Sequence, residues 1–72
     1  MNNKLFYYRR LCGMKQLDLA KGVGLSEQAI SCYERGRTDP TTEIAGKISG
    51  MLGVAVHKIF PKYIKDIKGK KQ

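Results

Sequence analysis

Polar side chains that can form specific hydrogen bonds concentrate in one short stretch of the sequence. Ala29, Ile30 and Tyr33 are spaced so that they fall on one face of a helix. The polar residues between and before them fall on the other face, and these are Ser26, Glu27, Gln28, Ser31 and Cys32. If the apolar face packs inward, the polar face is presented to a partner that is recognised by hydrogen bonds.

Gln28 carries the most specific group on this polar face. A carboxamide both donates and accepts, so it can pair with an adenine edge in the major groove of DNA. Glu27 only accepts, which suits the amino group of cytosine, or else it stabilises the helix N-terminus electrostatically. Cys32 either touches a thymine methyl group or stays an idle or buried thiol, and Ser31 reaches a base or a phosphate with little discrimination. These four residues are the predicted base contacts.

A second helical segment precedes this one, and residues 24–26 are the whole connection between the two. Leu19, Ala20 and Val23 have the spacing of one helix face, and Gly24 suits the left-handed conformation that ends a helix. The hydroxyl of Ser26 can cap the next helix. So short a connection does not let the second helix fold straight back along the first, which predicts the sharp crossing of a helix-turn-helix unit.

Glycine positions divide the chain into five short helical segments, and no convincing strand pattern is present. The glycines that directly follow an apolar-periodic segment, where a helix C-terminus favours glycine, are Gly13, Gly24, Gly36 and Gly53. We therefore expect an all-α fold. Gly46 and Gly50 lie inside the fourth segment, and their spacing predicts a close approach of a neighbouring backbone.

Two helix starts have candidate caps. We expect an asparagine, Asn2 or Asn3, to cap the first helix and a threonine, Thr41 or Thr42, to cap the fourth. Pro40 supports the second expectation because the residue before a proline avoids helical angles, so that a new helix begins after it.

The chain is expected to form one small domain over residues 1–61, followed by a lysine-rich tail at residues 62–72 that is partly ordered or flexible. Phe6 and Tyr7 lie opposite the apolar face of the first helix. Either the tail or a second subunit covers them, or they are two scattered surface aromatics.

The charge balance indicates a polyanionic partner. Fourteen Lys and Arg residues against six Asp and Glu residues give a net charge of +8. Such a field attracts nucleic acid first and anionic membrane surface second. The tail lacks a wide apolar face, so we do not expect membrane binding.

Other functional classes receive no support from the composition. The two cysteines, Cys12 and Cys32, and the single histidine, His57, cannot form a disulfide framework or a complete structural zinc site, and no cofactor is expected. Paired carboxylates and a nucleophile elbow are missing, which argues against an enzyme. With no signal peptide or membrane-spanning stretch evident, a cytoplasmic protein is expected.

Taken together, these residues resemble the Cro and repressor family of phage and bacteria, the Xre-like helix-turn-helix group. The matching stretches include GMKQLDLA, GLSEQAIS, YERG and KISGMLGVAVHKIF, and the resemblance covers residues 3–60 without an insertion. It implies a compact five-helix, lambda-repressor-like domain in which helices 2 and 3 form the helix-turn-helix. The third helix would enter the major groove, usually with the domain paired on a two-fold-symmetric operator.

The resemblance also implies roles for residues outside the third helix. It assigns a phosphate contact to Gln16, which stands at a helix N-terminus that favours an anion, and an ion pair to Arg9 and Glu34. Arg10 either contacts phosphate or is a solvated cation. The other expected phosphate contacts, which flank the same surface, are Lys15, Ser26, Arg35 and Arg37. Lys15 replaces the usual Ser or Thr cap of the second helix, so that this cap must come from elsewhere or be lost.

These observations predict a sequence-specific DNA-binding transcriptional regulator. Repression, a palindromic double-stranded operator and a homodimer follow from the resemblance alone. The alternative is a protein-interaction module on the same fold, such as an antitoxin or an accessory factor. No small-molecule ligand is expected, because the sequence leaves no room for a ligand-sensing domain.

Overall fold

A computed structural model describes residues 3–63 of the chain. Five α-helices and a final 3-10 turn follow one another: α1 (Leu5–Leu11), α2 (Gln16–Val23), α3 (Glu27–Arg35), α4 (Thr42–Leu52), α5 (Val56–Ile59) and η1 (Pro61–Tyr63). No residue in this range forms a strand. The expected all-α fold with five helices is therefore confirmed. No helix within residues 3–63 is long and apolar enough to cross a membrane.

Local side-chain and backbone chemistry sets the helix ends. The four predicted stops have φ angles of 73°, 77°, 76° and 69°, which only glycine adopts without strain, and they are Gly13, Gly24, Gly36 and Gly53. The hydroxyls of Ser26 and Thr41 accept hydrogen bonds from the N–H groups three residues further on, at 3.1 and 3.2 Å. The Asn3 carboxamide oxygen accepts from the N–H two residues on, at 3.0 Å. Helices α3 and α4 thus begin at predicted caps. At α1 the N-cap position is Lys4, and Asn3, one of the two predicted caps, lies one residue before it and bonds the first helical N–H.

Helix α2 begins without an acceptor on its N-cap side chain, because lysine carries only donors. The backbone N–H of that residue, Lys15, instead donates to the carboxylate of Asp18 at 3.1 Å. This is one half of a capping box, and it also places negative charge in the first turn, where the helix dipole favours it. Asp18 therefore stabilises the start of α2 through the backbone N–H of Lys15, which is a different group from the Asp18 N–H that a Ser or Thr cap would have bonded.

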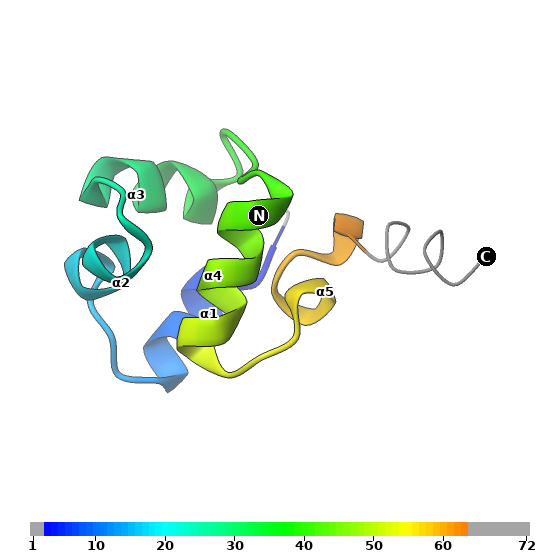
Figure 1. The fold of residues 1–72 in the computed structure, drawn as a ribbon, viewed down its shortest axis with the longest axis horizontal. Helices are drawn as coiled ribbons and strands as arrows, with labels where there is room; N and C mark the ends of the chain where they lie inside the picture. Colours follow the sequence, from blue (N-terminus) through cyan, green and yellow to red (C-terminus); the bar gives the residue numbers. More distant parts are fainter. Residues whose placement is uncertain (1–2, 64–72) are drawn as a thin grey trace.

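The core forms where all five helices meet. Each of the five helices contributes to its largest fully buried side chains, which are Leu5, Leu19, Ile30, Ile48, Ile59 and, directly after α5, Phe60. Helices α2 and α3 lie together at one end of the molecule, α5 and η1 lie at the other, and α4 runs between them (Figure 1). This arrangement leaves the outer surface of α3 uncovered by the other helices of residues 3–63.

The close helix approach that we expected at Gly46 and Gly50 is not found there. Both glycines are exposed, and within residues 3–63 a Cβ atom at either would meet no neighbouring element within 4 Å, so this prediction is wrong. The close approach occurs at Gly22 on α2, where an added Cβ would overlap the sulfur of Met51 on α4. The spacing along α4 suggested a contact at Gly46 and Gly50, but the rotation of that helix turns these two glycines to solvent.

The chain beyond α5 turns back onto the connection before α4. Tyr63 is buried, and its hydroxyl donates a hydrogen bond to the carbonyl of Pro40. Lys62 forms an ion pair with Asp39 at 2.7 Å. Tyr63 therefore packs with the domain that we expected to end at residue 61, while residues 64–72 of the expected tail lie outside the described residues.

Candidate nucleic-acid interface

Helix α3 has one face in the core and one face toward solvent. Ile30 is fully buried, and Ala29 and Tyr33 are half-buried beside it. On the opposite face, Glu27 and Gln28 are exposed, and the remaining two predicted base contacts are half-buried. The helix therefore packs in the orientation that the apolar spacing predicts.

A shallow hollow on this outer face brings together residues from both helices of the helix-turn-helix and from the loop after α3. It is lined by all four predicted base contacts and three of the predicted phosphate contacts, namely Gln16, Glu27, Gln28, Ser31, Cys32, Arg35 and Arg37. The residues that line the hollow include hydrogen-bond donors, acceptors and two arginines, which suits an anionic partner with hydrogen-bonding edges.

The other two predicted phosphate contacts lie outside this hollow. Lys15 lines a neighbouring hollow together with Arg9 and Arg10, and Gln16 and Glu27 border both hollows. Lys15 therefore lies beside the hollow on the outer face of α3.

The hydroxyl oxygen of Ser26 already accepts the capping hydrogen bond of α3. A hydroxyl also carries an O–H donor, so this cap and a phosphate contact are chemically compatible. The two roles of Ser26 considered from the sequence therefore do not compete for the same atom.

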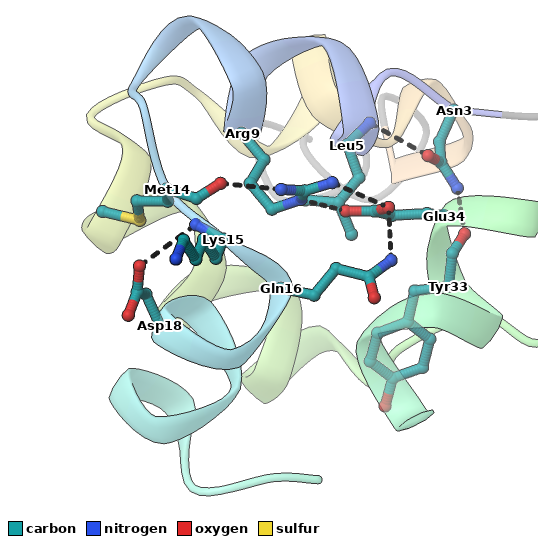
Figure 2. Close-up of polar contacts among 9 residues, drawn as sticks. All are labelled: Asn3, Leu5, Arg9, Met14, Lys15, Gln16, Asp18, Tyr33 and Glu34. Carbon is teal, nitrogen blue, oxygen red and sulfur yellow. Dashed lines mark hydrogen bonds and ion pairs between the residues drawn. The ribbon is translucent and has the colours of Figure 1, made fainter. Parts of the chain in front are cut away.

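A buried ion pair joins α1 to the last turn of α3 (Figure 2). Arg9 donates to both carboxylate oxygens of Glu34, from Nε to Oε2 and from Nη2 to Oε1 at 3.3 Å. The two side chains are only 7% and 5% exposed. Arg9 Nη1 also donates to the carbonyl of Met14 at 2.6 Å. The pair therefore also holds the connection that leads into α2.

Gln16 is held by the same carboxylate. Its Nε2 atom donates to Glu34 Oε1 at 3.0 Å, and its side chain points from the start of α2 toward the ion pair (Figure 2). One N–H of the amide is used in this bond, and an amide nitrogen carries a second that can donate to a phosphate oxygen. The phosphate contact stays a prediction, but the orientation of this side chain is set by Glu34. The two residues are 18 positions apart in the sequence, and nothing in their spacing indicated this bond.

A second side chain that sequence reasoning treated only as a cap also joins α1 to α3. Asn3 donates from Nδ2 to the carbonyl of Tyr33 at 2.8 Å while its oxygen caps α1. One carboxamide thus satisfies two backbone groups from different elements. Together with Arg9 it fixes α1 against the C-terminal half of α3.

Metal binding finds no support in the described part of the chain. Residues 3–63 contain no group of three His, Cys, Asp or Glu side chains that could hold a metal ion. Cys12 and Cys32 are both free thiols.

Two helices joined by a three-residue turn, with the second presenting a polar and cationic face, define the helix-turn-helix class of proteins. The model of the helix-turn-helix family matches residues 5–59, which include α1 to α5. The chain belongs to this family.

Curated relatives carry names of the same kind. An uncharacterized HTH-type transcriptional regulator of Methanocaldococcus jannaschii is 47% identical over 60 residues, which are 83% of this chain and 91% of the relative. Two uncharacterized HTH-type transcriptional regulators of Archaeoglobus fulgidus are each 30% identical over 60 residues, covering 83% of this chain and 86% and 84% of the relatives.

Proposed function

We propose that this chain is a DNA-binding transcriptional regulator that recognises a specific operator by inserting α3 into the major groove. The observation that carries the proposal is the hollow on the outer face of α3, where seven predicted contact residues converge. The family membership and the net charge of +8 support the same conclusion.

In this proposal the exposed residues of α3 contact bases and the surrounding residues contact the backbone. Gln28 pairs with an adenine edge, and Glu27, Ser31 and Cys32 contribute the remaining base contacts. The phosphate contacts that hold α3 in register come from Lys15, Gln16, Ser26, Arg35 and Arg37. Arg9 and Glu34 do not contact the DNA in this proposal. They act indirectly, because their ion pair holds Gln16 and the end of α3 in place.

The finer proposal is a repressor that binds a palindromic operator as a homodimer. It is supported by the resemblance to the Cro and repressor group. A two-fold-symmetric dimer places its two recognition helices in successive major grooves, so half-sites are expected about 10 base pairs apart.

Selection of bound sequences from random duplex DNA tests this proposal. The expected result is one enriched palindromic sequence with half-sites about one helical turn apart. An enriched sequence without a palindrome would retain the DNA-binding function and remove the dimer. If no sequence were enriched at moderate salt, the DNA-binding proposal would be wrong.

A protein-interaction module is the second candidate, and one feature of α1 favours it. Tyr7 and Leu11 are 56% and 66% exposed and lie one helical turn apart, so they form an apolar strip on the surface. A partner protein could cover this strip without blocking α3. A pull-down that recovers one stoichiometric partner, combined with failure to select DNA, would favour this role.

A further inference from the structure

Phe6 on α1 lies next to the candidate DNA surface. Its side chain lines a hollow together with residues of α2 and α3, and these are Gln16, Ser31, Glu34 and Arg35. Three of these four also line the hollow on the outer face of α3, so the two hollows adjoin one another. The sequence placed Phe6 only opposite the core face of α1, whereas the fold turns it toward the predicted contacts.

The surroundings of Phe6 suit an anionic neighbour. The guanidinium carbons of Arg9 and Arg10 both lie 5.4 Å from the centre of its ring, and 41% of the residue is exposed. Among the described residues that line its hollow, the only carboxylate belongs to Glu34, which is paired with Arg9. A DNA strand whose phosphate is bound by Gln16 and Arg35 would therefore pass over an apolar ring that has the cationic Arg10 beside it.

We propose that Phe6 is a further DNA contact, with its ring packing against the deoxyribose of the nucleotide whose phosphate Gln16 and Arg35 bind. This inference rests on the proposed function. Deoxyribose presents carbon and hydrogen atoms between the phosphates, and an aromatic ring is the apolar surface that can cover them. The contact adds affinity by removing apolar surface from water, and it involves neither charge nor a base edge.

The test compares binding of Phe6→Ala and wild type to the selected operator as a function of salt. The expected result is about 10-fold weaker binding with an unchanged salt slope and an unchanged preference for the operator over a base-substituted operator. Phe6→Leu retains apolar surface and is expected to bind more tightly than Phe6→Ala. Tyr7→Ala is the matched control, because Tyr7 is the adjacent and more exposed aromatic residue and does not line this hollow. Its affinity should equal that of wild type.

Two other roles for Phe6 give different results. If the ring acted only by holding Arg10 on a phosphate, Phe6→Ala would lower the salt slope by about 0.9 and Phe6→Leu would not restore affinity. If the ring only stabilised the fold, the operator affinity of each variant would fall in step with its melting temperature. Phe6→Ala and Phe6→Leu would then differ in affinity only as far as they differ in stability. Either outcome overturns the proposal.

Failure of the inference and failure of the proposed function are distinguishable. Wild type that selects no operator contradicts the DNA-binding function. Wild type that binds its operator while Phe6→Ala binds it equally well contradicts the Phe6 contact alone.

Discussion

At the scale of single residues, two polar side chains on α3 have different roles: one stabilises the fold and the other is a predicted DNA contact. Glu34 is 4% exposed and is bonded to side chains from α1 and α2. Gln28, six residues earlier on the same helix, is exposed and lines the outer hollow. Substitution of the first should therefore affect folding, and substitution of the second should affect binding.

Glu34→Ala is expected to lower the free energy of unfolding by about 3–5 kcal/mol, because it leaves the buried guanidinium of Arg9 without its carboxylate. For a domain of this size, such a loss can prevent folding. Urea denaturation followed by circular dichroism measures the change. Glu43→Ala is the control, because Glu43 forms only an exposed pair with Lys47 at 3.9 Å, and its removal should change stability little. A Glu34→Ala protein with the melting temperature of wild type would contradict the structural role.

Gln28→Ala is expected to keep the wild-type melting temperature and to bind the selected operator about 10- to 100-fold more weakly, since a bidentate contact to adenine contributes about 1–3 kcal/mol. The same variant should lose its preference for adenine at one position of each half-site. Fluorescence anisotropy with the operator and with single-base variants measures both effects. Unchanged base preference would place Gln28 outside the base contacts.

At the scale of elements, the final turn supports the connection that follows the candidate interface. Arg37 lies in the segment between α3 and α4, and that segment is bonded to η1 through Pro40 and through Asp39. Helices α1, α2 and α3 are similarly joined at the Arg9–Glu34 pair. The interface is thus supported from two sides by contacts between distant segments.

Tyr63→Phe is expected to lower the free energy of unfolding by about 1 kcal/mol, because it removes the hydrogen bond to the buried Pro40 carbonyl while keeping the ring packed on Phe60. Chemical denaturation measures the loss. Lys47→Ala is the control, because its ion pair with Glu43 joins side chains that are 52% and 80% exposed, and pairs of this kind contribute little. A loss for Tyr63→Phe no larger than that for Lys47→Ala would contradict the role of this hydrogen bond.

At the scale of the whole molecule, the charge of +8 should make DNA binding strongly dependent on salt. With three cationic phosphate contacts in each domain of the proposed dimer (Lys15, Arg35 and Arg37), a plot of log affinity against log salt concentration should have a slope near −5, since each such contact releases about 0.9 counterions. Arg35→Ala should make that slope shallower by about 1 for each domain without changing base preference. Binding titrations at salt concentrations between about 50 and 200 mM measure the wild-type slope and its change in Arg35→Ala. A slope near zero would contradict a backbone-contacting interface.

The sequence alone determined the helices and their ends. Gly24 and Gly36 ended α2 and α3 as predicted, and Ser26 and Thr41 began α3 and α4. These features depend on interactions within about four residues along the chain, where residue type and spacing are sufficient. The apolar spacing on α3 also predicted which face packs inward, because helical periodicity fixes relative direction within one element.

Only the tertiary structure decided how those helices meet. It joined Gln16 to Glu34 and Asn3 to Tyr33 across 18 and 30 residues, and it placed Phe6 beside the outer face of α3. It also put the close approach of α2 and α4 at Gly22, although the spacing within α4 had suggested other glycines. Spacing within one helix carries no information on how that helix is rotated against its neighbours. That rotation follows from packing the whole core, and here it determines which side chains surround the proposed DNA contacts.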